Sequence, residues 1–203
     1  MAFVQCSQKA VSSNISCDQS HSEGVKTVAV AINRDDVVIT YAANADSSVN
    51  KNKITSLTPV VGKKWIAIQA QGDVPIPTAT SSQDAESKRV TDTIQINTGN
   101  IGAGFGSEVV APLTTKGAKF IVVVQRSDNG GDSGDSAFRV YGTGQGVEFS
   151  YTEDMNDQAT YGCEQLIGVD SNGVKGGSWL HDTDYATNNT LFKALLAANL
   201  GTV

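Results

Sequence analysis

The amino-acid sequence predicts a mainly β protein, an antiparallel β-sandwich or barrel of the kind that has extended loops and one C-terminal α-helix. Three observations lead to this fold class. Glycine contributes 20 of the 203 residues and charged residues only 18%, which is typical of a soluble β-protein rich in turns. Runs of β-branched residues recur between polar, glycine-rich segments. The hydrophobic fraction of 39% is large enough to support a core.

Two regions differ in composition. Residues 1–23 are polar and rich in Ser, Gln and Asn, so we expect an N-terminal arm or a loosely packed lead-in. Residues 24–203 contain the strand patterns and are expected to form a single β-rich domain. The spacing of Cys6, Cys17 and Cys163 matches no CxxC motif, which favours reduced thiols, and a Cys6–Cys17 disulfide stays as the alternative.

The first half of the chain shows five strand patterns. They cover 24–32, 37–43, 53–58, 63–71 and 91–96. In the fourth, Trp65 and Ala67 oppose Ile66 and Ile68, which gives one apolar and one mixed face, as in a half-exposed antiparallel strand. Residues 72–88 contain two prolines and a Ser/Thr/Gln cluster that break the pattern, with a short helical turn as an option at 82–90.

The second half predicts four more strands and then the helix. The strands cover 118–126, 138–142, 146–154 and 164–170, and residues 97–108 are expected to be loop. The helix is expected at about 189–200, because leucines recur at helical spacing, Asn188 or Asn189 can cap its start, and Gly201 follows its end.

The run Gly142–Gly146 resembles part of a nucleotide-binding fingerprint. A dinucleotide site needs a helix after the glycines, because the phosphate binds at the helix N-terminus. Here residues 147–152 follow, and they alternate apolar and polar as a strand does. The run therefore predicts a turn between two strands, in which the glycines supply positive φ angles and leave a flat surface for a neighbour.

The acidic loop at 128–135 resembles a calcium site. Its acids Asp128, Asp132 and Asp135 do not have the EF-hand spacing, and the twelfth-position glutamate of that motif is missing. The pattern favours a flexible hairpin tip over a fortuitous calcium site.

Catalytic chemistry finds no support in the sequence. Ser133 has no strand–elbow–helix context, and His181 beside Asp182 is more typical of a solvated loop. Glu153 and Asp154 would point to opposite faces of a strand or into a turn, so they would not reach one glycosidic bond together. We therefore expect that the protein is not an enzyme and that it binds neither a metal ion nor a cofactor.

The net charge and the apolar runs of the chain limit the kinds of partner that we expect. The net charge of −6 argues against general binding to nucleic acid, which needs a basic face. No stretch of 18 apolar residues occurs, so we expect no membrane span.

Three stretches, "GVKTVAVAI" (24–32), "NKITSLTPVVGKKWIAIQAQ" (52–71) and "FRVYGTGQGVEFSYTEDMNDQATYGCEQLIGVDSNG" (138–173), carry a family resemblance. Their order resembles bacteriophage tail-tube proteins, in particular divergent ones from viruses of gut bacteria. The resemblance implies a β-sandwich or barrel of the tail-tube type and a structural virion protein. The C-terminal helix departs from the simplest version, in which the helix lies between strands.

The resemblance also implies partners and a location. The chain would stack as homo-oligomeric rings, six-fold by the resemblance, in the virion tail after assembly in the host bacterial cytoplasm. Other tail proteins, such as the tape measure and the tail terminator, would be partners, and DNA would pass through without tight binding.

Site residues follow from these expectations. The candidates facing the channel are Glu148, Glu153, Asp154 and Asp157, since an acidic lumen repels the DNA backbone. The candidates for contact between stacked rings are Asp128, Asp132 and Asp135.

Two other functions remain open at this point. One is a head–tail connector, ring or adaptor protein of the virion. The other is a monomeric β-sandwich binding module, such as an adhesin or a carbohydrate-binding domain, for which Trp65, Trp179 and Tyr185 are the candidate aromatics. Trp179 is the best of these, although a core position next to the helix is the simpler interpretation.

Overall fold

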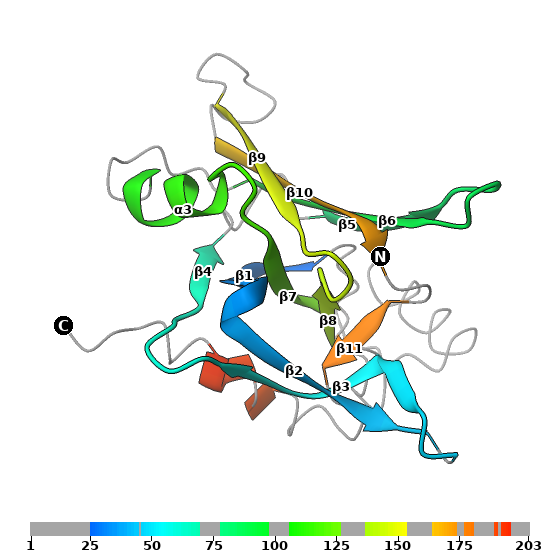
Figure 1. Cartoon of the computed structure of the whole chain (residues 1–203). Helices are drawn as coiled ribbons and strands as arrows, with labels where there is room; N and C mark the ends of the chain where they lie inside the picture. The colour runs from blue at the N-terminus through cyan, green and yellow to red at the C-terminus, as the bar shows by residue number, and fades with distance from the viewer. Residues whose placement is uncertain are drawn as a thin grey trace, which may run out of the picture.

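The computed structural model describes residues 25–44, 46–69, 78–97, 106–126, 137–153, 164–173, 177–180, 189–190 and 192–195. Within them the protein is mainly β, with two sheets and a few short helical segments (Figure 1). The strands are β1 (Val25–Asn33), β2 (Val37–Ala43), β3 (Val49–Pro59), β4 (Ile66–Gln69), β5 (Thr78–Gln83), β6 (Val90–Asn97), β7 (Phe120–Arg126), β8 (Phe138–Tyr141), β9 (Glu148–Glu153), β10 (Glu164–Gly173) and β11 (Ser178–Leu180). The expected arm, 1–23, lies outside the described residues.

Seven strands form a curled sheet in the order β2-β3-β11-β8-β7-β1-β4 (Figure 1). Its neighbours pair antiparallel except β11 and β3, which are parallel with Trp179 opposite Lys53. The expectation of a purely antiparallel architecture is therefore wrong at this pair. The two strands lie far apart in the chain, so no hairpin forces them to run in opposite directions.

The other four strands form a second sheet in the order β5-β6-β10-β9, all antiparallel. In Figure 1 it lies as a separate layer above the curled sheet. Its central pair is long, with β10 matched to β6 from Gln165 opposite Asn97 to Gly173 opposite Val90.

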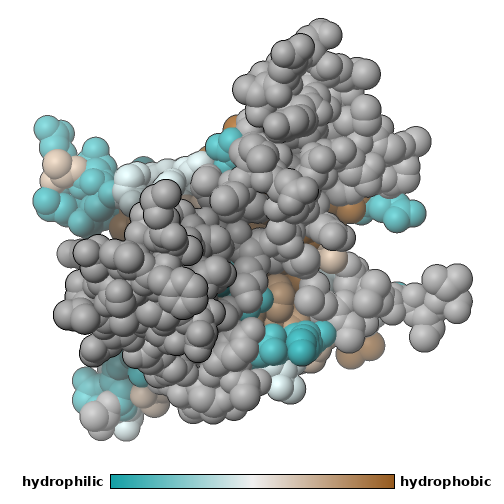
Figure 2. Space-filling view, turned by 180° about the vertical axis from the view of Figure 1, so that it is seen from behind, coloured by the Kyte–Doolittle hydropathy of each residue, from teal (hydrophilic) through white to brown (hydrophobic). Residues whose placement is uncertain are grey.

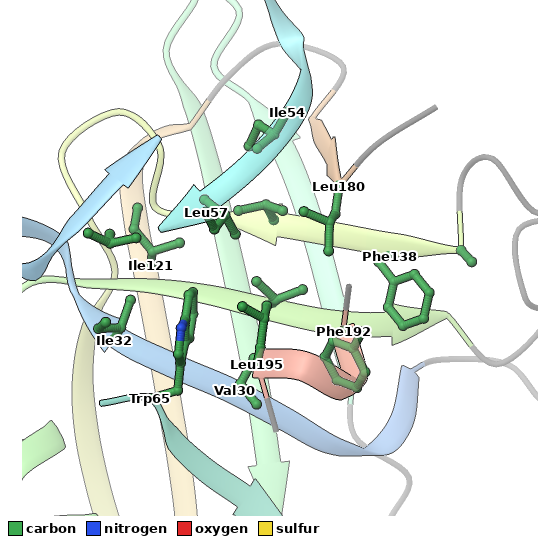
Figure 3. Packing of buried hydrophobic residues seen from close by; sticks show 14 residues of the cluster. Val30, Ile32, Ile54, Leu57, Trp65, Ile121, Phe138, Leu180, Phe192 and Leu195 are labelled. Atoms are coloured by element: carbon green, nitrogen blue, oxygen red, sulfur yellow. The ribbon is translucent and has the colours of Figure 1, made fainter. Parts of the chain in front are cut away.

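Two apolar clusters make the core, one on each face of the curled sheet. The cluster between the sheets is built from Ala29, Ala31, Ile68, Ile94, Ile96, Leu113, Phe120, Val122, Val124, Tyr141, Val147, Phe149 and Leu166. The cluster inside the curl includes Val30, Ile32, Ile54, Leu57, Trp65, Ile121, Val123, Phe138, Leu180, Phe192 and Leu195 (Figure 3). Strand β7 contributes alternate residues to both, which explains its unbroken apolar run.

The C-terminal helix covers the inner cluster. Residues 189–190 and 192–195 are helical, and the rest of the expected helix at 189–200 lies outside the described residues. Phe192 stacks on Phe138 with ring centroids 4.8 Å apart (Figure 3). The helix thus closes the apolar side of the curl.

The expectation of one helix is wrong. Three further short helical segments occur: η1 (Arg34–Asp36), η2 (Gly106–Val110) and α3 (Ala111–Leu113). Segment η2 begins within the expected loop 97–108, and α3 follows it directly. They are too short for a helical periodicity to appear in the sequence, and buried Val110 and Leu113 anchor them.

Strand β5 lies where the prolines predicted a break. Its sequence TATSSQ lacks apolar alternation, so pairing with β6 makes it a strand rather than its own pattern. The optional helical turn at 82–90 is instead a hairpin turn, in which Asp84 Oδ1 accepts hydrogen bonds from Ser87 N (2.6 Å) and Glu86 N (3.0 Å). This hairpin projects from the body (Figure 1) and is hydrophilic in the view from behind (Figure 2).

Candidate assembly surface

The outer face of the four-stranded sheet is rich in hydroxyl groups. Inward positions such as Ile94, Leu166 and Phe149 belong to the core between the sheets, and side chains alternate along each strand. The hydroxyl-bearing outward positions on β5, β6 and β9 are Thr80, Ser82, Thr91, Thr93, Ser150 and Thr152. We call this surface the hydroxyl face. Its described outward positions include no Lys or Arg.

Glu148 lies on the hydroxyl face, as the alternation predicted. The side chain of Phe149 is 9% exposed and belongs to the core, whereas that of Glu148 is 61% exposed. Its carboxylate lies 3.3 Å from Lys119 Nζ, whose side chain is 41% exposed. The charge of Glu148 is therefore partly offset by a neighbour, which the sequence did not indicate.

The side chains of the remaining predicted acids lie outside what the structure describes. Glu153 ends β9 opposite Glu164, and only its backbone is described. The other candidates, Asp154, Asp157, Asp128, Asp132 and Asp135, lie outside the described residues. Tyr185, the third candidate sugar-binding aromatic, also lies outside the described residues.

Both sheets end in strands with one unpaired side within the described part of the chain. These are β5 and β9 in the four-stranded sheet and β2 and β4 in the curled sheet. Unpaired backbone N–H and C=O groups on such edges can pair with another chain. Within the described residues each sheet therefore has two edge strands.

Exposed valines lie beside the β2 edge. Val38 is 58% exposed on β2, and Val61 is 98% exposed in the turn after β3. The turn is held to the start of β2, because Val60 N donates to Asp36 O (2.9 Å) and Lys63 Nζ lies 3.1 Å from Asp36 Oδ1. The exposed valines of this turn therefore lie in a segment whose position is fixed by a hydrogen bond and an ion pair.

The glycine turn between β8 and β9 is confirmed. Gly142 and Gly146 have φ angles of +84° and +93°, which only glycine adopts easily. A side chain at Gly142 would meet Phe120 O, and one at Gly144 would meet Asn172 O. These glycines therefore face the chain's own backbone, and the flat surface expected for a neighbour is not what they provide.

The two candidate tryptophans differ in their surroundings, and Trp179 does not have the core position that was the simpler expectation for it. Trp65 is fully buried in the inner cluster with Leu195 of the helix. Trp179 is half-buried on β11, with Arg126 and Arg139 over its ring at 5.8 and 5.3 Å. Trp179 is therefore not a core residue next to the helix, and its ring is engaged by guanidinium groups rather than open for a sugar.

An apolar pocket of about 300 Å³ opens beside the helix. Leu57, Pro59, Trp65, Leu180 and Leu195 are among its lining residues. The indole nitrogen of Trp65 is buried and has no hydrogen-bond partner. The pocket suits an apolar group.

A buried polar cluster between the sheets was missed in the sequence. Asp92 on β6 and Asp170 on β10 are cross-strand partners, 3% and 0% exposed. A signal for Asp92 existed, because alternation in 90–96 places it on the same face as Ile94 and Ile96. The same alternation places Asp170 on the face of Leu166.

Hydrogen bonds link this cluster across the two sheets. Arg139 Nη2 on β8 donates to Ser81 Oγ on β5 (2.9 Å), and Ser81 Oγ donates to Asp92 Oδ1. Asp170 Oδ1 accepts from Asn172 N (3.0 Å), the backbone of Gly142 also acts on this carboxyl group and lowers its pKa, and Asp170 Oδ2 is buried without a hydrogen-bond partner. Burial raises the pKa of both carboxyl groups, and the charge of Asp92 raises the pKa of Asp170 further.

Other chemistry is limited within the described part of the chain. No group of three or more His, Cys, Asp or Glu side chains is placed there to hold a metal ion. None of the described helices has the length and apolar character needed to cross a membrane. Comparison with protein-family models, curated proteins and solved structures finds no match.

Proposed function

We propose that this chain is a structural subunit of a bacteriophage tail tube, which stacks as rings around a channel for DNA. The hydroxyl face is the observation that carries the proposal, and we assign it to the channel wall. A structural virion protein needs no catalytic group and no cofactor, and its partners are further copies of itself and other tail proteins.

The composition of the hydroxyl face supports the proposal. DNA must slide through a tube without sticking, and each phosphate neutralised by Lys or Arg adds affinity through counterion release. The described outward positions of β5, β6, β9 and β10 have hydroxyl, amide, apolar or acidic side chains and no basic ones. The outward positions of these strands therefore lack the groups that would hold the DNA backbone, and the neighbouring Lys119 is paired with Glu148.

The open edges support ring formation. Strands β5 and β9 lie at opposite edges of the four-stranded sheet. If β9 of one copy pairs with β5 of the next, the sheets join into one closed barrel with no free edge. Six copies would close the ring by the family resemblance, and the hydroxyl faces would then surround the bore.

The acidic candidates for the channel wall and for the contact between rings are compatible with this arrangement. Glu148 lies on the hydroxyl face, so six copies would make a ring of carboxylates in the bore, each near Lys119. Glu153, Asp154 and Asp157 remain candidates for the same wall. Asp128, Asp132 and Asp135 remain candidates for contact between stacked rings.

Negative-stain electron microscopy and native mass spectrometry of the purified full chain test the proposal. We expect rings or stacked tubes with a central channel. A monomer that persists at high concentration and after long incubation would contradict the proposal and favour a monomeric binding module. A single ring that never stacks would favour a connector or adaptor ring.

A variant pair tests the role of the β9 edge. Ser150→Lys places a lysine on the hydroxyl face of this edge strand, where it opposes pairing and repeats around the bore as like charges. We expect folded subunits, judged by circular dichroism, that no longer form rings. Thr115→Lys adds the same charge at an exposed site outside both sheets and should leave assembly unchanged. Equal assembly of the two variants would exclude β9 from the ring contact.

A further inference from the structure

The buried polar cluster between the sheets contains two carboxyl groups in one small space. Asp92 and Asp170 face each other across antiparallel strands, which places their Cβ atoms about 4.5–5.5 Å apart. Both side chains point to the interior, and within the described residues neither forms an ion pair. Two buried carboxylates this close repel each other strongly if both are ionised.

Two cations act on the pair, and burial outweighs both of them. Arg139 donates to Ser81 and forms no ion pair with Asp92, although its positive charge lowers the pKa of Asp92, and its guanidinium lies against the rings of Tyr141 and Trp179. Lys119 acts on Asp170 from a distance. Burial raises the pKa of Tyr141 to about 12, so this phenol adds no charge at neutral pH.

The atoms show where a proton fits. Asp170 Oδ1 accepts a hydrogen bond from Asn172 N, and the backbone of Gly142 also acts on this carboxyl group and lowers its pKa, whereas Asp170 Oδ2 has no hydrogen-bond partner. A side chain at Gly173 would collide with the Asp92 carboxyl, so this glycine leaves room for that group beside β10. The charge of Asp92 acts on Asp170, so a proton bound at Asp170 Oδ2 would satisfy the unpartnered oxygen and remove the repulsion between the two groups.

We propose that Asp92 and Asp170 share one proton at neutral pH and act as a pH-dependent clasp between the two sheets. The protonated pair, Ser81 and Arg139 then join β10, β6, β5 and β8 in one hydrogen-bonded chain. Loss of the proton leaves two buried negative charges and loosens the contact of the four-stranded sheet with the curled sheet. The inference does not depend on the proposed function.

The sign of the pH dependence follows from the raised pKa values of both groups. The folded state binds the shared proton more tightly than the unfolded chain does. The contribution of the pair to stability is therefore full at acid pH and is lost as the pH rises through the raised pKa. Exposed aspartates with lowered pKa values act in the opposite sense and at lower pH.

Thermal unfolding of the full chain between about pH 5 and about pH 8 tests the clasp. We expect the Tm of the wild type to fall as the pH rises. Asp170→Asn and Asp92→Asn keep the shape of a protonated carboxyl group but cannot ionise. Each should flatten this fall and melt above the wild type at the alkaline end.

Asp84→Asn is the matched control. Asp84 is exposed and hydrogen bonds from Ser87 lower its pKa, so it is ionised throughout the range. Its variant should keep the slope of the wild type. A slope that is the same in Asp170→Asn, Asp92→Asn and the wild type would overturn the proposal.

Infrared spectroscopy of the wild type decides the matter even if both asparagine variants fail to fold. The carbonyl stretch of a protonated carboxyl group should be present at neutral pH and disappear on alkalisation. Its absence at neutral pH overturns the proposal. If added Ca²⁺ or Mg²⁺ raises the Tm while this band is absent, the pair holds a metal cation instead of a proton.

Discussion

Replacement of Gly142 by alanine tests how the turn between β8 and β9 is built. Gly142 has φ +84°, which costs an alanine roughly 1–2 kcal/mol. The added Cβ would also press on Phe120 O, which accepts a hydrogen bond from Val147 N (2.8 Å) while Phe120 N donates to Val147 O (2.9 Å). Disruption of this bridge costs about 0.5–1.5 kcal/mol for each hydrogen bond.

The expected loss for Gly142→Ala is therefore about 3 kcal/mol, which for a domain of this size lowers Tm by roughly 6–12 °C. Urea unfolding followed by circular dichroism gives the free energy of unfolding, and thermal melting gives Tm. Because the contact lies within one chain, the loss of folding stability should be the same whether or not the subunits assemble.

Two control glycines separate the backbone cost from the steric cost. Gly117 has φ +79° but open space around its Cβ position, so Gly117→Ala should lose only about 1–2 kcal/mol. Gly106 has neither a positive φ nor a close neighbour, so Gly106→Ala should be neutral or stabilise by up to about 1 kcal/mol. If Gly142→Ala is no more harmful than Gly117→Ala, the contact with Phe120 does not constrain this turn and the reasoning is refuted.

Two further predictions concern the helix and the hydroxyl face. Phe192 is 3% exposed and stacks on Phe138, so Phe192→Ala should lose about 3–5 kcal/mol in urea unfolding; a loss below about 1 kcal/mol would mean that the C-terminal helix is not part of the folded core. The ion pair of Glu148 with Lys119 is solvated, so Glu148→Gln should change the free energy of unfolding by less than about 0.5 kcal/mol, with little dependence on salt. A larger loss in thermal melting would show that this ion pair supports the fold.

Features that depend on local periodicity could be predicted from the sequence alone. The alternation in 147–152 placed Phe149 in the core and Glu148 on the outer face, because successive side chains of a strand point to opposite sides. The apolar run of β7 predicted a strand, and the structure shows it covered on both faces. The glycines at 142 and 146 predicted a turn with positive φ, because glycine alone adopts these angles at low cost.

Features that depend on contacts between residues distant in the chain became visible only in the three-dimensional fold. Strand β5 has no apolar pattern, and it exists because β6 supplies its hydrogen bonds. Trp65 and Trp179 look alike in the sequence, yet one is buried inside the curl and the other lies under two arginines. Asp92 and Asp170 each follow a strand pattern that predicts an inward side chain, but their encounter requires the register of β6 against β10. Register and strand order result from the packing of the whole core, so no local pattern in either strand specifies the pair.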